Sequence, residues 1–257
     1  NPFSFAIFGS CFPGVSDHFC CDDFVQKILS AYSNAFQSDN DQFRYFAFSH
    51  FLPILQFVYA RKFDFDQNAF LGLFLNILRN ESNEANIIEE ITVLSTFISF
   101  YGGQFREFLQ PIFEVLDIFL NLFQSSFHIY DVISCYKYLA SYFRADIMVF
   151  CQNINLLFCR YFDNFQEYRD AFFYCLENIP FFALSFPNFG DICGKLFTFI
   201  FTQIYNSNFE PSISLTEGEM NSIIVFLSNY MNNGLTIPID FVLPILGLAF
   251  KYSNSPI

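Results

Sequence analysis

The spacing of polar residues constrains the fold of this chain more than any other feature of its sequence. Within residues 105–124, intervals of three and four residues separate consecutive polar side chains: Glu107, Gln110, Glu114, Asp117, Asn121 and Gln124. This is the period of an α-helix that carries one narrow polar stripe and is apolar around the rest of its circumference. Such a helix must be covered on several sides by neighbouring helices.

The same spacing recurs along most of the chain, and no segment sustains the period of two that is typical of strands. Gly and Pro fall mostly between the periodic segments, where helices are expected to end. We therefore predict an all-α fold. The predicted helices span residues 19–37, 42–60, 67–79, 85–101, 105–124, 129–143, 146–161, 165–177, 189–206, 217–232 and 238–252.

The predicted helices form two alternating sets with regular starting points. One set starts near residues 67, 105, 147, 189 and 238, and the other near 42, 85, 129, 165 and 217. The spacing within each set approximates the length of HEAT and armadillo repeats, in which stacked helix pairs leave each helix only a narrow exposed strip. The sequence thus predicts a HEAT/armadillo-type α-solenoid of about five to six repeats. We expect it to extend over residues 1–257 as one segment of a longer chain.

Proline recurs inside three apolar runs of these predicted helices, at Pro53, Pro111 and Pro244. A proline in a helix interior removes one backbone hydrogen bond and kinks the helix. The pattern predicts three kinked helices.

The composition excludes several classes of protein. Hydrophobic residues make up 53% of the 257 residues and charged residues 14%, which is the opposite of a disordered chain. The net charge of -13 argues against a nucleic-acid binder, which needs a basic face. The apolar runs are shorter than the roughly 20 residues of a membrane-spanning helix, so we expect no membrane span. The 42 Phe residues are expected to fill core positions that Leu takes in most proteins.

The sequence carries no motif of catalysis or cofactor binding. It lacks the glycine-rich phosphate loops, the nucleophile elbow and the paired histidines of zinc proteases. His18, Cys20 and Cys21 lie among carboxylates that together could hold a metal, but a helix N-terminus explains this segment better. The eight Cys residues have no paired spacing, which suits a reducing compartment. We predict a protein that is not an enzyme and uses no cofactor and no metal.

Acidic residues are densest between residues 81 and 90. We predict that Glu84, Glu89 and Glu90, together with Glu114 and Asp117 of the next helix, form an acidic strip that attracts a basic partner. The alternative is that these carboxylates simply face water in a loop and in the first turn of a helix, where acidic residues are favourable.

Two segments resemble the importin-β (karyopherin-β) superfamily of nuclear transport receptors: Ile88-Glu89-Glu90-Ile91, and residues 104–115 with the sequence QFREFLQPIFEV. The resemblance is to the C-terminal half of the import receptors. It implies a HEAT-repeat scaffold that passes between cytoplasm and nucleus and binds protein cargo. It also implies binding to Phe-Gly nucleoporins, and to the GTPase Ran through an N-terminal part that this chain lacks.

Two alternatives remain open from the sequence. The first is another HEAT or armadillo scaffold, such as a vesicle-coat, phosphatase- or kinase-regulatory, or cytoskeletal adaptor. The second is a helical enzyme or membrane protein whose site the sequence does not reveal.

Overall fold

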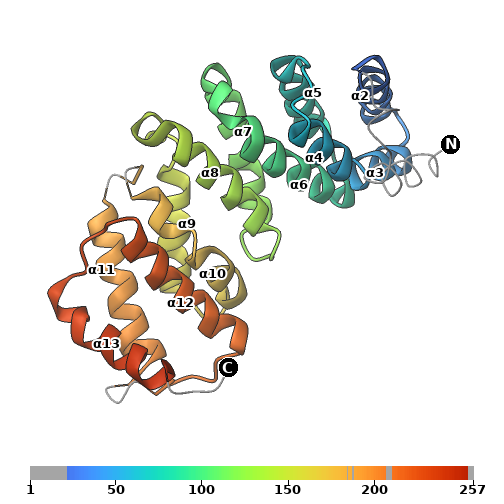
Figure 1. Cartoon of the computed structure of the whole chain (residues 1–257). Coiled ribbons are helices and arrows are strands. Elements are labelled where there is room, and N and C mark those ends of the chain that lie inside the picture. Colours follow the sequence, from blue (N-terminus) through green and yellow to red (C-terminus); the bar gives the residue numbers. More distant parts are fainter. Residues whose placement is uncertain (1–21, 184, 187, 207–209, 254–257) are drawn as a thin grey trace. The chain divides into compact units, whose positions relative to one another are not determined.

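A computed structural model describes residues 22–183, 185–186, 188–206 and 210–253 (Figure 1). The predicted all-α fold is confirmed, since the described residues form helices and no strand. An isolated β-bridge joins Tyr205 to Pro211. His18, Cys20 and Cys21, considered above as metal ligands, lie outside the described residues.

The helices follow one another with short connections. The α-helices are α2 (Asp22–Phe36), α3 (Asp41–Ser49), α4 (Leu52–Ala60), α5 (Gln67–Asn80), α6 (Glu84–Tyr101), α7 (Leu109–Leu122), α8 (Ile129–Phe143), α9 (Gln152–Asp163), α10 (Arg169–Leu176), α11 (Phe189–Phe199), α12 (Glu217–Asn232) and α13 (Ile239–Ser253). The shorter turns are η3 (Gly102–Gln104), η4 (Arg106–Phe108), η5 (Arg144–Ile147), η6 (Ile179–Phe182) and the π-helical turn η7 (Ile200–Ile204).

The chain divides into two compact units, and the boundary between Phe119 and Leu120 falls inside α7. In the first unit, α2 packs against α3 and against α5, while α3 and α4 both pack against α6. The last two helices of this set, α5 and α6, also pack against each other. A helix of this unit therefore contacts its hairpin partner and also the corresponding helix of the following hairpin, an arrangement that can be followed in Figure 1.

Phenylalanine dominates the core of the first unit. Phe36 is fully buried and stacks on Phe48 with a centroid distance of 4.0 Å, while Phe51 meets Phe36 edge-on at 5.2 Å. Phe74 and Phe97 continue this cluster from α5 to α6 with a centroid distance of 6.1 Å. Offset-stacked and edge-on pairs are the favoured aromatic geometries. The Phe residues thus pack by ring geometry as well as by apolar area, and do more than replace Leu.

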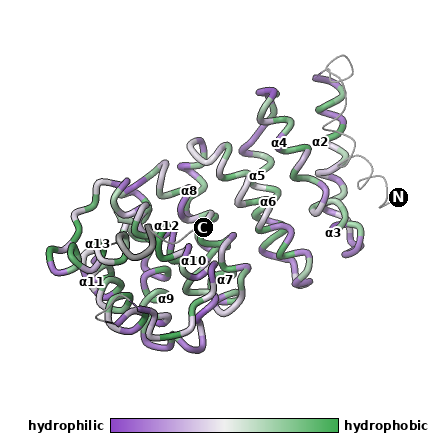
Figure 2. The backbone as a smooth tube through the Cα atoms, turned by 60° about the horizontal axis from the view of Figure 1, so that its bottom comes forward, coloured by the Kyte–Doolittle hydropathy of each residue, from purple (hydrophilic) through white to green (hydrophobic). Residues whose placement is uncertain are grey.

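The second unit follows the same packing rule. Two consecutive hairpins can be traced, α9 with α10 and α11 with α12: α9 packs against α11, and α10 packs against both α8 and α12. The short turn η6 fills the space between α8 and α12. Figure 2 shows hydrophobic residues recurring along these helices, with hydrophilic residues gathered mainly at the turns.

Several helix boundaries differ from the sequence prediction. The predicted helix 42–60 is two helices, because α3 ends at Ser49 and Pro53 lies in the first turn of α4. Pro111 likewise lies in the first turn of α7. A missing N–H costs nothing in a first turn, so these two prolines start helices rather than kink them. Pro244 is inside α13, as predicted. Thr216 and Glu219 form a capping box at the start of α12.

The ring packing of the first unit can be tested by truncating Phe74, which is fully buried. We expect Phe74→Ala to lower the free energy of unfolding by about 3–5 kcal/mol, because it leaves a cavity. Because ring geometry contributes, we expect Phe74→Leu to cost more than the roughly 1.5 kcal/mol that limits most volume-conserving apolar exchanges. Urea denaturation followed by circular dichroism measures both. Phe127→Ala is the control, since Phe127 is 59% exposed and should change stability little.

Candidate functional site

The described residues of the second unit form a groove between helices. It consists of two cavities of about 610 and 800 Å³, which share the lining residues Phe162, Asp163, Phe199 and Gln203. The groove lies between the C-terminal end of α9 on one side and α11 with η7 on the other.

The floor of the groove is aromatic. Phe165 is buried and meets Phe199 edge-on at a centroid distance of 4.8 Å, and Phe172 contacts both rings from below at 5.4 and 5.6 Å. Phe162 and Phe199 are half-buried, so each has one face in the core and one available in the groove. A rigid aromatic floor offers apolar contact area at a low cost in side-chain entropy.

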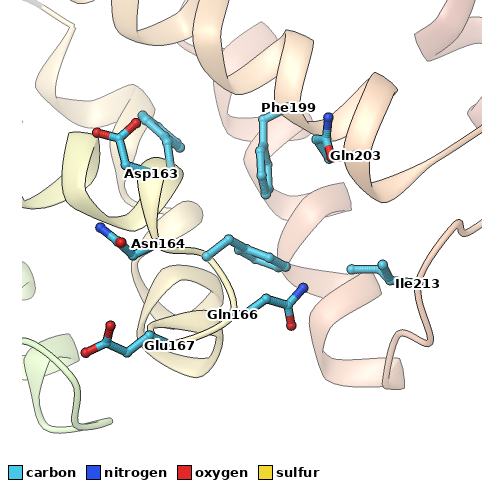
Figure 3. A pocket seen from close by; sticks show the side chains of 9 residues that line it. Asp163, Asn164, Gln166, Glu167, Phe199, Gln203 and Ile213 are labelled. Carbon is cyan, nitrogen blue, oxygen red and sulfur yellow. The ribbon is translucent and has the colours of Figure 1, made fainter.

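A tight turn between α9 and α10 forms one wall. The helix α9 ends at Asp163, and Asn164 caps it by donating its backbone N–H to Arg160 O at 3.0 Å. The backbone N–H of Glu167 then bonds to Asn164 O at 3.0 Å. Figure 3 shows the side chains of Asp163, Asn164 and Glu167 directed away from Phe199, whereas Gln166 points toward Ile213. The polar groups of this turn thus form the rim, and the rings form the floor.

The opposite wall is a helix surface with little side-chain bulk. Gly190 and Gly194 lie one turn apart on α11, and a Cβ atom added at either position would meet no atom within 4 Å. The helix then widens into the π-helical turn η7, where Tyr205 donates its N–H to Ile200 O at 2.9 Å. Turns of this type occur often at functional sites, because they displace the side chains of an otherwise regular helix. Here the turn includes Gln203, which lines both cavities.

The charged residues along the groove are mostly acidic. Asp163, Glu167 and Asp191 contribute carboxylates, while Lys195 is the one cation among the described lining residues. Carboxamides of Asn164, Gln166 and Gln203 add neutral donors and acceptors. A surface with apolar rings, amides and an acidic rim can bind an extended segment that carries apolar and basic side chains.

A partly exposed ion pair connects the elements around the groove. Arg169, the first residue of α10, donates from Nε to Glu219 Oε1 at 2.5 Å and from Nη2 to Glu219 Oε2 at 2.9 Å. Its guanidinium also bonds to the carbonyl oxygen of Ser214, next to the lining residue Ile213. The bonds from Arg169 and from the Thr216 cap hold the pKa of Glu219 below its usual value. This cluster therefore joins α10, α12 and the segment that carries Ile213.

The predicted acidic strip is not continuous in the structure. Glu84 is exposed in the first turn of α6, whereas Glu89 and Asp117 are half-buried on α6 and α7. Glu114 of α7 pairs with Arg79 of α5 at 2.8 Å, which neutralises its charge. The carboxylates of this strip are thus partly compensated within the first unit.

The assignment of Glu90 to this strip is wrong, because its side chain is fully buried. On α6 it follows Asn86 by four residues and precedes Leu94 by four, and both of these residues are buried as well. This spacing puts Glu90 on the core face of the helix.

Sequence reasoning missed the groove. The predicted helix 165–177 begins too early, because the structure has a turn after Asp163 and starts α10 at Arg169. The available signal was the break in periodicity between Asn164 and Tyr168, where polar residues flank the single buried ring of Phe165.

Two further features are absent from the described part of the chain. No helix there is long and apolar enough to cross a membrane. No three or more His, Cys, Asp or Glu side chains gather there in an arrangement that could hold a metal ion.

The Arg169–Glu219 pair predicts a pH-dependent loss of stability. We expect Glu219→Gln to lower the free energy of unfolding by about 1–2 kcal/mol at neutral pH, because the pair is partly exposed. The folded-state pKa of Glu219 is depressed, so its stabilisation is present above the unfolded-state value and is lost as the pH falls through the folded-state value. Urea titrations at neutral and at acidic pH should therefore give a difference that shrinks in acid. Glu217→Gln, at an exposed position two residues earlier, should show no such difference.

Comparison with protein-family models, with curated proteins and with solved structures finds no match for this chain.

Proposed function

We propose that this chain is a protein-binding scaffold built as an α-solenoid of the HEAT/armadillo type, without catalytic activity. The observation that carries the proposal is the packing rule within each unit. The helix α10 packs on α8 and α12, and α9 packs on α11, as α2 packs on α5 in the first unit. Stacking of each helix on the helix of the next hairpin is the packing of a solenoid, whose extended surfaces bind other proteins.

The partner that best fits the groove is an extended, positively charged segment of another protein. Three carboxylates line the rim against one lysine, and the whole chain has a net charge of -13. Complementary charge raises the association rate and excludes acidic competitors. The exposed rings of Phe162 and Phe199 supply apolar contacts for alternate side chains of such a segment.

Among scaffolds, we propose nuclear transport as the cellular role to test first. The support is the resemblance of residues 88–91 and 104–115 to importin-β receptors, which implies protein cargo, Ran and Phe-Gly nucleoporins as partners. These segments form part of α6, the turns η3 and η4 and the first half of α7. The alternative is a scaffold of another process, such as a vesicle-coat or kinase-regulatory adaptor.

A pull-down separates these two roles. We expect both immobilised Phe-Gly repeats and Ran loaded with GTP to bind the protein if it acts in transport. If neither binds, the transport role is excluded. The scaffold proposal is tested separately, by the binding of a peptide to the groove.

Filling the groove should block binding without weakening the fold. We expect Gly194→Leu to abolish binding of a fluorescein-labelled peptide of alternating lysine and leucine, because the new side chain occupies the groove. Leucine is a better helix former than glycine by roughly 0.5–1 kcal/mol, so stability should not fall. Gly72→Leu on α5 is the matched control, since its Cβ also meets open space but lies away from the groove. Fluorescence anisotropy measures binding, and equal loss in both variants would contradict the proposed site.

The rim charges predict a dependence on charge and on salt. We expect Asp163→Asn combined with Glu167→Gln to weaken binding of the same peptide by up to about tenfold. Added salt should weaken binding to the wild type more than to this variant. Glu84→Gln combined with Glu89→Gln, in the first unit, should leave the affinity unchanged. If that control weakens binding instead, the acidic residues of α6 rather than the groove form the site.

A further inference from the structure

The one fully buried carboxyl group of the first unit, Glu90, has no hydrogen-bond partner among the described residues, although buried carboxyl groups are normally paired. It lies on the face of α6 that α3 packs against, where it interacts electrostatically with Arg44 of α3 and with Glu81. An uncompensated carboxylate in such a place costs several kcal/mol or takes up a proton.

Arg44, the one cation among the described residues that acts on Glu90, is already bonded to other groups. Arg44 donates to Glu81 Oε2 at 2.8–2.9 Å, to Asp41 Oδ1 at 2.7 Å and to Ser38 O at 2.6 Å. The guanidinium of Arg44 therefore already bonds to two carboxylates, those of Glu81 and Asp41, and is not bonded to Glu90.

Glu81 is the ionised member of the cluster. Its side chain is only 2% exposed, and it accepts bonds from the backbone N–H groups of Ser82 and Asn83 at 2.9 Å and from Asn86 Nδ2 at 3.0 Å. Burial opposes ionisation, but these bonds and those from Arg44 hold the pKa of Glu81 below its usual value. A fixed negative charge thus faces Glu90.

In the part of the chain that the structure describes, no cation from the other elements packed on α6 acts on Glu90. From α4 comes Tyr59, whose ring stacks on Phe100 at 4.1 Å. From α5 comes Arg79, which pairs with Glu114. Burial, and then the charge of Glu81, raise the pKa of Glu90 to about 8, although Arg44 lowers it in part. The side chain is accordingly a neutral acid in the closed structure at neutral pH.

The Arg44–Glu81 pair also borders a cavity. Arg44 and Glu81 line a cavity of about 340 Å³ together with Ser38 and Asn80, while Glu90 itself does not line it. Separation of α3 from α6 would break the Arg44–Glu81 pair and let water from this cavity reach the carboxyl group.

We propose that protonation of Glu90 controls local opening between α3 and α6, so that the first unit loosens as the pH rises from mildly acidic to mildly alkaline values. In the closed form the neutral acid stays buried. In the open form the carboxyl group of Glu90 is hydrated and ionises as an ordinary glutamate does. At neutral pH the open form therefore binds fewer protons than the closed form. Rising pH therefore favours opening until the closed form also ionises.

Hydrogen exchange on the full chain tests this coupling. We expect the opening equilibrium constant of the α3 amides, corrected for intrinsic exchange, to rise by up to about tenfold per pH unit between about pH 5.5 and 7.5 and to level off above pH 8. Amides of α11, in the second unit, should show no such rise. Glu90→Gln, which stays neutral at every pH, should make the α3 profile flat.

A matched variant separates this effect from general charge effects. Glu114→Gln, which removes a half-exposed carboxylate of the same unit, should keep the wild-type profile. A flat profile in the wild-type protein, or an equally steep one in Glu90→Gln, would overturn the proposal. If Glu90→Gln does not fold, the wild-type profile decides alone.

Discussion

Most of the described helices pack against more than one neighbour, and the remaining structure depends on how their apolar surface is buried. The hairpin partner covers one flank, and the corresponding helix of the following hairpin covers the next, as α10 does between α8 and α12. The helices that bury one another's apolar surface in this way lie close together in the sequence. This proximity favours fast formation of contacts between near neighbours, because little loop entropy is lost before each contact forms.

The sequence could predict that the chain is helical and roughly where each helix lies, because both follow from the period of polar residues. The boundaries at Pro53 and Pro111 could not, because periodicity does not distinguish a proline that kinks a helix from one that begins it. The groove was missed for a related reason. Asp163 and Asn164 are good capping residues at either end of a helix, and only tertiary packing assigns them to the end of α9.

The burial of Glu90 was, by contrast, readable in the sequence. The polar stripe of its helix runs through Glu89, Thr92, Thr96 and Ser99, and Glu90 lies about 100° away from Glu89 on the wheel. As a charged residue, Glu90 is expected at the surface from composition alone. Its position in the helical period instead predicts that it faces the core. Glu81 and Glu219 stay ionised through arginine and backbone donors, whereas Glu90 lacks such donors.

The interruption between α3 and α4 has a mechanical consequence. Two short helices, joined at His50 and Phe51, lie along the same helix α6. The backbone bonds from Phe51 N–H to Phe48 O and from Leu55 N–H to Phe51 O bracket this joint at 3.1 and 3.0 Å. A continuous helix resists bending along its whole length, whereas two helices with a break between them bend mainly at the break. Under tension or on engaging a partner, this joint would act as the compliant element of the first unit.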